Sequence, residues 1–124
     1  MIGNILAVFF GGALGALFRF LISEFLPVIR WGIPFTIIIV NFTGCFIMGF
    51  ADSFYESKIV DSYIRYFLTV GLLGGFTTFS TFSLEFYGLI KSGNIAGSFI
   101  YLFISVFMSL AGFIAGYTAA RLLK

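Results

Sequence analysis

Hydroxyl side chains recur in the C-terminal part of the chain with the spacing of a helix face. Tyr101, Ser105 and Ser109 are four residues apart, so their side chains lie on one face of a helix. Together they would form a ladder of hydrogen-bond donors about 12 Å long at 1.5 Å per residue. Donors without a fixed charge suit an anion that must pass quickly, although the same ladder could instead join two helices through hydrogen bonds.

Two phenylalanines stand among hydroxyls in the run from Gly74 to Glu85. Phe79 and Phe82 are three residues apart and are each followed by a serine, Ser80 and Ser83. Because an aromatic ring has a positive edge, ring edges turned into a pore could attract a small anion. The ordinary alternative for such a pair is a lipid-facing or core position.

Three further polar side chains occupy apolar surroundings, where they are costly and are therefore candidates for function. Asn41 lies in the middle of an uncharged stretch, Arg19 follows 18 uncharged residues, and Glu85 ends the hydroxyl-rich run. Asn41 could donate to an anion or bond to a neighbouring helix. Arg19 and Glu85 could guard the ends of a pore or mark the membrane surface.

The composition identifies the elements that must position these groups. Of the 124 residues, 60% are hydrophobic and only 10% are charged, whereas a soluble domain carries about 25% charged residues. The chain is therefore predicted to be an integral membrane protein.

The composition also excludes several functions. The chain has no His, and its single Cys45 cannot form an intrachain disulfide. With no imidazole and no converging catalytic set, no enzyme is expected, and a net charge of +2 without a basic run argues against a nucleic-acid partner.

Four stretches are long and apolar enough to cross a bilayer, which needs roughly 20 helical residues. They cover about 2–26, 31–51, 66–84 and 92–120. The prediction is an all-α membrane protein with a single four-helix domain, 1–124. Glycines four residues apart in three of the spans would let helix backbones approach closely; they are Gly11 and Gly15, Gly71 and Gly75, and Gly112 and Gly116.

The third span is predicted to be broken near its middle. Gly74 and Gly75 precede five serines and threonines, and Gly costs about 1 kcal/mol relative to Ala in a helix, while Ser and Thr compete for backbone hydrogen bonds. A break would free carbonyl oxygens, which membrane proteins use to hold Na⁺ or K⁺. The alternative is an intact helix whose hydroxyls bond back to carbonyls one turn earlier.

The basic residues hardly favour either orientation in the membrane. With four spans, the side that holds both termini carries four Lys or Arg, namely Lys58, Arg65, Arg121 and Lys124. The other side carries three, namely Arg19, Arg30 and Lys91. Topology follows the imbalance between sides, so either the chain inserts both ways or one charge decides. We expect dual topology and an antiparallel homodimer.

A resemblance to a known family lies in the run Gly74-Gly-Phe-Thr-Thr-Phe-Ser-Thr-Phe-Ser-Leu-Glu85. It resembles the signature of the bacterial Fluc fluoride channels, also called the CrcB family, whose third helix carries G-G-x-[ST]-T-F-S-T-F-[ST]-x-E. The likeness extends to a G-G-x-x-G-x-x-x-R pattern from Gly11 to Arg19 and to Val40-Asn41.

The resemblance implies a dual-topology antiparallel homodimer with two parallel fluoride pores, each built from both subunits. It also implies that the third helix is broken at mid-membrane and that the backbone carbonyls of Gly74 and Thr77 hold a structural Na⁺ on the dimer axis. Phe79 and Phe82 correspond to the paired pore phenylalanines, with their edges toward fluoride, and Asn41 to the pore asparagine.

The remaining family positions follow in the same way. By the resemblance, the family's polar track corresponds to Ser80, Ser83, Tyr101, Ser105 and Ser109. The basic and acidic ends of its motifs correspond to Arg19 and Glu85. One segment departs from the family, which commonly has P-x-G-T-L before the V-N. This chain has Thr36 where the Gly is usual and Ile37 where the Thr is usual, so the role of that Thr is absent or shifted by one residue.

These expectations combine into a passive fluoride channel in the inner membrane of a bacterium, with fluoride, the lipid bilayer and a second copy as partners. HF crosses membranes and dissociates inside, so a channel would release the trapped F⁻. One alternative is a small four-helix, dual-topology, proton-coupled drug exporter, which needs an acidic residue buried in the first span. A second is a non-transporting assembly subunit, which would explain the glycine pairs but not the hydroxyl ladder.

Overall fold

Four long apolar helices make up the computed structural model, which describes residues 1–56 and 60–124. Within these residues, the stretches long and apolar enough to cross a membrane are Ile2–Phe25, Thr36–Tyr55, Ser62–Lys91 and Ile95–Leu122, with mean hydropathies of 2.2, 1.7, 1.4 and 2.1. The predicted all-α architecture with four membrane-spanning helices is confirmed. Lys58, which was counted above toward one side, lies outside the described residues.

The elements follow one another in a simple order. Helix α1 (Ile2–Phe25) leads into a small antiparallel hairpin of β1 (Ile29–Arg30) and β2 (Ile33–Pro34), and α2 (Thr36–Tyr55) follows. The third span consists of α3 (Ser62–Arg65), the π-helix η1 (Tyr66–Leu73), α4 (Gly74–Phe76) and α5 (Ser80–Lys91). The last helix is α6 (Ile95–Leu122).

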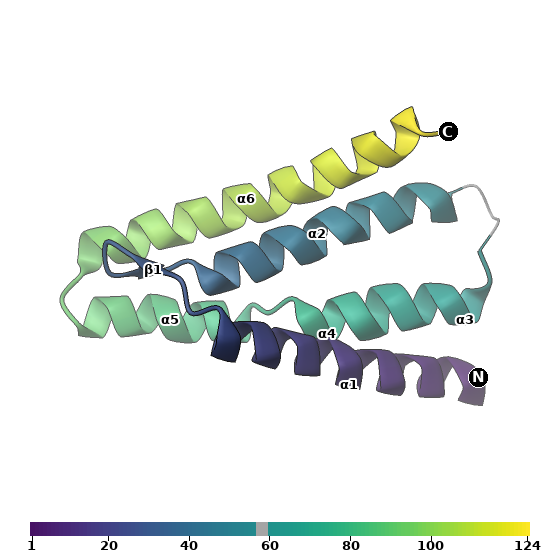
Figure 1. The fold of residues 1–124 in the computed structure, drawn as a ribbon, viewed down its shortest axis with the longest axis horizontal. Helices are drawn as coiled ribbons and strands as arrows, with labels where there is room; N and C mark the ends of the chain where they lie inside the picture. Colours follow the sequence, from purple (N-terminus) through teal and green to yellow (C-terminus); the bar gives the residue numbers. More distant parts are fainter. Residues whose placement is uncertain (57–59) are drawn as a thin grey trace.

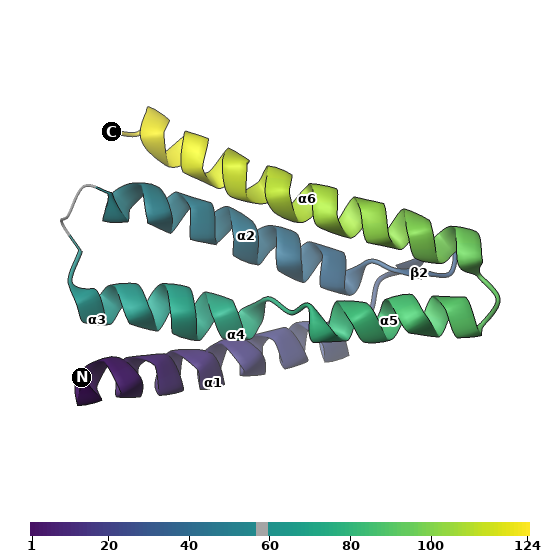
Figure 2. The ribbon, with the colours of Figure 1, turned by 180° about the vertical axis from the view of Figure 1, so that it is seen from behind.

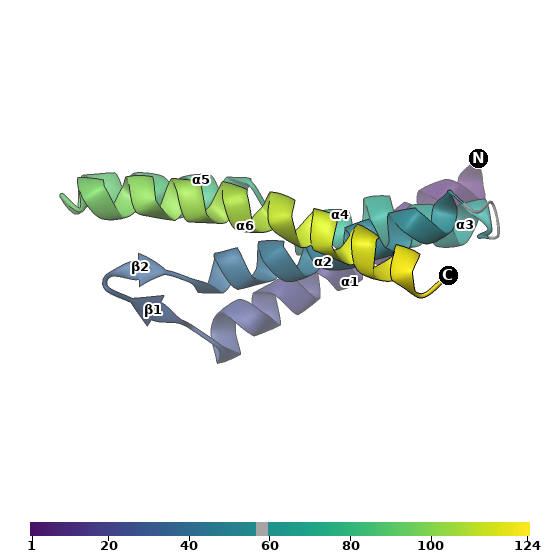
Figure 3. The same cartoon turned by 90° about the horizontal axis from the view of Figure 1, so that it is seen from above.

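The helices pack as two pairs. Helix α2 runs along α6, and α1 runs along η1 and α4, the first half of the third span (Figure 1). The view from behind shows the same order of helices (Figure 2). Seen from above, the hairpin extends at the end of the molecule opposite both termini (Figure 3).

Glycines bring both pairs of helices into backbone contact. Gly15 of α1 and Gly116 of α6 are buried. A Cβ at Gly15 would collide with the carbonyl oxygen of Leu72, and one at Gly116 with the carbonyl oxygen of Phe46. The predicted glycine pairs are therefore contact points between α1 and the third span, and between α2 and α6.

The start of the second span differs from the expected 31–51. The expected span begins inside the hairpin, whereas α2 begins at Thr36 and continues to Tyr55. The chain turns because Trp31 and Gly32 adopt positive φ angles of 53° and 74°. The Thr36 hydroxyl then fixes this connection, since it accepts a hydrogen bond from the Val28 amide at 2.8 Å and donates one to the Leu26 carbonyl at 3.0 Å.

The predicted break in the third span is confirmed. Helix α4 ends at Phe76, Thr77 is extended with φ −77° and ψ 155°, and α5 begins at Ser80. The preceding η1 is a π-helix, a form that is rare and is frequent at functional sites. The two halves of the span have different neighbours, because η1 and α4 pack on α1 while α5 packs on α6.

Candidate ion-binding site at the helix break

The side chain of Asn41 replaces two backbone hydrogen bonds that the break removes. Its Nδ2 donates to the Thr78 carbonyl at 2.9 Å, and its Oδ1 accepts from the Thr78 amide at 2.8 Å. Of the two alternatives for Asn41, the structure shows the bond to a neighbouring helix. One Nδ2 hydrogen is not used by this pair of bonds, so Asn41 keeps a donor for a second partner.

Two of the carbonyl oxygens that lose their helical donors at the break belong to Gly74 and Thr77. In a continuous helix the Thr78 amide would bond to the Gly74 carbonyl, but it bonds to Asn41. The Thr81 amide would likewise bond to the Thr77 carbonyl, but it bonds to Thr78 Oγ1 at 3.1 Å. Within the described residues, neither the Gly74 nor the Thr77 carbonyl oxygen receives a hydrogen bond.

These two oxygens have the chemistry of Na⁺ ligands, because unwound backbone carbonyls are the groups that coordinate Na⁺ in membrane transporters. Both residues line a recess of about 360 Å³, the break recess, which also borders Cys45. Among the described residues there is no cluster of three or more His, Cys, Asp or Glu suited to a metal ion. The Gly74 and Thr77 carbonyls are therefore candidate ligands for a cation in this recess.

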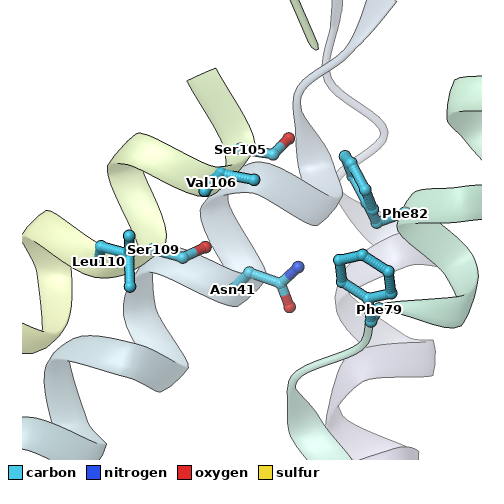
Figure 4. Close-up of a pocket in the computed structure, with 7 residues that line it drawn as sticks. All are labelled: Asn41, Phe79, Phe82, Ser105, Val106, Ser109 and Leu110. Carbon is cyan, nitrogen blue, oxygen red and sulfur yellow. The ribbon is translucent and has the colours of Figure 1, made fainter. Parts of the chain in front are cut away.

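A second recess, the phenylalanine recess, lies beside the first and has a volume of about 200 Å³. Its lining residues come from α2, the start of α5 and α6; they are Asn41, Phe79, Phe82, Ser105, Val106, Ser109 and Leu110. Figure 4 shows the two rings on one side, with Asn41, Ser105 and Ser109 facing them. The recess opens at the surface of the single chain, where Phe79 is 74% exposed.

The aromatic side of this recess extends into the core. The Phe79 and Phe82 ring centroids are 5.1 Å apart, and Phe82 stacks on Tyr101 at 5.2 Å. Phe82 and Tyr101 are buried, and the Tyr101 hydroxyl donates to Glu85 Oε2 at 2.5 Å. Tyr101 and Glu85 therefore lie directly behind the ring that lines the recess.

The Ser105 hydroxyl is one of three buried hydroxyls without a hydrogen-bond partner among the described residues; the other two are Ser53 and Tyr55. Ser105 is 5% exposed and its Oγ lies beside the Tyr101 hydroxyl, whose proton goes to Glu85, but no hydrogen bond of standard length and angle joins Ser105 Oγ to a described residue. A buried hydroxyl without a partner costs about 1–3 kcal/mol. Because Ser105 lines the phenylalanine recess, a ligand in that recess could satisfy this donor.

Three of the predicted residues lie elsewhere. Ser80 and Ser83 are exposed and line neither recess. Ser80 Oγ shares a hydrogen bond with Thr78 Oγ1 at 3.1 Å, and Ser83 Oγ donates to the Phe79 carbonyl at 2.8 Å. Arg19 lies beside the break, where its Nε donates to the Gly75 carbonyl at 3.3 Å.

Sequence reasoning missed the role of Thr78, although it lies inside the recognised run. Its backbone binds Asn41 and its hydroxyl caps α5 through the Thr81 amide. A Ser or Thr just before a helix, whose hydroxyl can accept a hydrogen bond from a backbone amide in the first turn, is the usual sequence signal of an N-terminal cap. The hydrophobic wall formed by Val106 and Leu110 has no such signal, because apolar residues are common everywhere in this chain.

Thr36 and Ile37, the two residues at which the sequence departs from the family pattern, have structural roles in this chain. Thr36 uses its hydroxyl within the connection from α1 to α2. Ile37 is 2% exposed and belongs to an apolar cluster with Phe82 and Tyr101. Neither residue lines the recesses described above.

Comparisons with known proteins agree on one family. The sequence model described as "CrcB-like protein, Camphor Resistance (CrcB)" matches residues 6–117. The chain is 43% identical over 118 residues to "Fluoride-specific ion channel FluC 2" of Nocardia farcinica, which covers 94% of this chain and 84% of the relative. It is 42% identical over 114 residues to "Fluoride-specific ion channel FluC" of Desulfotalea psychrophila, and the alignment covers 92% of this chain and 89% of that relative. A relative of the same name in a Hydrogenobaculum species is 44% identical over 101 residues, and the alignment covers 80% of this chain and 82% of that relative.

Proposed function

The chain belongs to the CrcB family, and we propose that it is a fluoride-selective channel that releases cytoplasmic F⁻ passively. It is a multi-pass protein of the bacterial inner membrane and not an enzyme. The structural observation that carries the proposal is the phenylalanine recess, which is lined by hydrogen-bond donors and, among the described residues, by no charged side chain. Such donors replace the water shell of a small anion without the strong binding of a fixed cation.

Weak-acid chemistry explains why a passive channel suffices. HF crosses membranes as a neutral molecule and dissociates in the cytoplasm, where F⁻ is trapped. The negative-inside membrane potential drives an anion outward with about 2.3 kcal/mol per charge per 100 mV. No coupling to ATP or protons is needed.

We assign the donors of this path to residues from two helices. The Ser105 hydroxyl, which has no partner among the described residues, and the remaining Nδ2 hydrogen of Asn41 donate to the ion. The edges of Phe79 and Phe82 provide the opposite wall. Tyr101 and Ser109 continue the donor ladder along α6, and Glu85 orients the Tyr101 hydroxyl.

A second copy of the chain would complete the pore. In one chain the recess opens at an exposed Phe79, and Gly74, Ser80 and Ser83 are exposed in the same part of the third span. An antiparallel partner would cover these residues, and the nearly even numbers of basic residues on the two sides suit insertion in both orientations. The carbonyls of Gly74 and Thr77 from both chains would then hold a structural Na⁺ at the interface.

The drug-exporter alternative lacks its central group. Within α1 the acidic residue is Glu24, which is exposed near the end of the helix. Proton-coupled exchange needs a carboxylate buried in the span, so this function is not favoured. The assembly-subunit alternative leaves the unpartnered Ser105 hydroxyl unexplained.

The test is fluoride efflux from liposomes that contain the purified protein, measured with a fluoride electrode while valinomycin clamps the potential. We expect rapid fluoride release and no chloride release. Phe82→Ile should reduce fluoride release, whereas Phe103→Ile, at a ring that is 69% exposed on α6, should not. Correctly assembled protein that releases no fluoride would exclude the channel.

A further inference from the structure

The turn of the hairpin holds a tryptophan in a backbone conformation that bulky residues rarely adopt. Arg30 pairs with Ile33, so the connection consists of the two residues Trp31 and Gly32, with φ angles of 53° and 74°. Asn, Asp or Gly is the usual first residue of such a turn, and a bulky residue at positive φ is an outlier. Because the turn itself favours other residues, the reason for a tryptophan here lies in its side chain.

The Trp31 side chain contributes little to the packing of the protein. It is 86% exposed, and its ring contact among the described residues is with Phe35, at a centroid distance of 6.4 Å. The hairpin is held instead by its second strand, because Ile33 is 4% exposed and belongs to an apolar cluster with Leu89. The turn therefore projects from a fixed base at the end of the molecule opposite both termini (Figure 3).

Exposed apolar side chains continue from the first span into this turn. Four of them are between 62% and 86% exposed; they are Phe25, Leu26, Ile29 and Trp31. On the outside of a membrane-spanning helix such side chains lie against lipid, and Trp is enriched where a span meets the headgroup layer. The apolar surface of the hairpin is therefore an extension of the surface that α1 presents to the bilayer.

Arg30 adds a positive charge next to Trp31. It is exposed, and within the described residues its guanidinium has no hydrogen bond, ion pair or ring contact. A guanidinium binds a phosphate through paired hydrogen bonds, and anionic lipids attract basic residues at the membrane surface. Lys91, at the same end of the molecule, differs because its Nζ already lies over the Tyr87 ring, 5.9 Å from the centroid.

We propose that the hairpin is a docking surface for the phospholipid headgroup layer. The Trp31 indole lies at the boundary between headgroups and acyl chains, and Arg30 binds a lipid phosphate, with a preference for anionic phospholipids. The unfavourable turn conformation is retained because it directs the indole away from the protein and into this layer. Ile33 connects this surface to the apolar cluster that also contains Phe82 and Tyr101.

The fluorescence of Trp31 reports this surface directly, since it is the only tryptophan of the chain. The purified full-length protein is reconstituted in liposomes whose phospholipids carry bromine either close to the headgroup or at the ends of the acyl chains. We expect bromine close to the headgroup to quench the fluorescence about twofold more strongly than bromine at the chain ends, because Trp prefers the interface. Acrylamide dissolved in the water should quench it weakly.

Three results would overturn the proposal. Strong quenching by acrylamide with weak quenching by both lipids would place Trp31 in water. Stronger quenching from the chain ends would place it in hydrocarbon. Weak quenching by every reagent would show that protein, such as a second copy of the chain, covers it.

Arg30→Gln tests the contact with a phosphate. Liposomes contain equal amounts of phosphatidylglycerol and phosphatidylcholine, and only one of the two is brominated. Wild-type fluorescence should be quenched about twofold more strongly by brominated phosphatidylglycerol, because the guanidinium enriches anionic lipid around the turn. Arg30→Gln should remove this difference, and the matched control Lys91→Gln should keep it. A difference that persists in Arg30→Gln, or none in the wild type, would contradict the role of Arg30.

Trp31→Asn separates the lipid surface from the fold. Asn suits the turn better than Trp, so the melting temperature in detergent, followed by circular dichroism, should not fall. The increase in melting temperature on addition of phosphatidylglycerol should be smaller than in the wild type, whereas Trp31→Tyr, which keeps an amphipathic ring, should retain it. A clearly lower melting temperature of Trp31→Asn in detergent would show that Trp31 serves the packing of the protein, contrary to the proposal.

Discussion

Asn41 of α2 and Thr78 of the broken third span form a reciprocal pair, because each donates one hydrogen bond to the other, at 2.9 and 2.8 Å. The pair satisfies the Thr78 backbone and fixes the loop between α4 and α5. It also places the Asn41 amide at the border of both recesses. The hydrogen bonds that satisfy the Thr78 backbone at the break therefore also position the Asn41 amide, which is the proposed pore donor.

Asn41→Asp tests this double role. The carboxylate still accepts from the Thr78 amide, but it loses the donor to the Thr78 carbonyl and adds a negative charge beside the proposed path. We expect fluoride efflux to fall at least 100-fold in protein that still assembles. Asn94→Asp is the matched control, because Asn94 caps α6 only as an acceptor from the Gly97 amide at 2.9 Å. Efflux equal to that of the wild type would show that Asn41 is purely structural.

Ser105→Ala separates function from stability. Because Ser105 Oγ has no hydrogen-bond partner in the described structure, its removal should leave the melting temperature unchanged or raise it. Fluoride efflux should fall about tenfold, because the path loses a donor. Ser98→Ala serves as control, since the Ser98 hydroxyl bonds to the Ile95 carbonyl at 2.6 Å and lines neither recess. A clear loss of stability in Ser105→Ala without loss of efflux would contradict the assignment.

Tyr101→Phe removes the hydrogen bond to Glu85 while keeping the ring that stacks on Phe82. The half-buried carboxylate then lacks its donor, at a cost of about 1–3 kcal/mol. We expect a lower melting temperature together with reduced efflux, since Tyr101 lies directly behind the phenylalanine recess. In Tyr117→Phe the lost bond is to Glu56, the exposed residue that caps the C-terminal end of α2, and efflux should be unaffected. Similar effects of the two substitutions would argue against a role of Tyr101 in the path.

Gly116→Ala tests the close packing of α2 on α6. An added Cβ would meet the Phe46 backbone, so the helices must separate, and we expect a large loss of melting temperature or of assembly. Gly88 on α5 has nothing within 4 Å of an added Cβ. Gly88→Ala should therefore be neutral or stabilising by up to about 1 kcal/mol. Thermal unfolding followed by circular dichroism distinguishes these outcomes.

The sequence predicts the number of spans because uncharged stretches of this length have few alternatives, but the third span, expected at 66–84, covers Ser62–Lys91. The break was predictable from Gly74, Gly75 and the hydroxyl residues after them, since these residues are poor helix formers. The hairpin was not, because Trp31 and Gly32 lie in an apolar stretch that also suits the start of a span. Its turn depends on positive φ angles and on the hydrogen bond between the Thr36 hydroxyl and the Val28 amide.

The faces of the broken span were harder to predict than its existence. A continuous helix keeps a fixed angle between successive side chains, but the extended Thr77 resets that angle for the residues that follow. Ser80 and Ser83 consequently lie at the surface of the chain, while Phe82 is buried. Their place on a polar track of the dimer stays a prediction.

The division of the third span between two neighbours has a consequence for the order in which the protein loses structure. Because η1 and α4 pack on α1 while α5 packs on α6, we expect the chain to unfold as two cooperative units that meet at Thr77–Phe79. Amide hydrogen exchange should then show two protection levels within one membrane span, with the fastest exchange at the junction. A continuous helix of the same length would exchange as a single unit, fraying only from its ends.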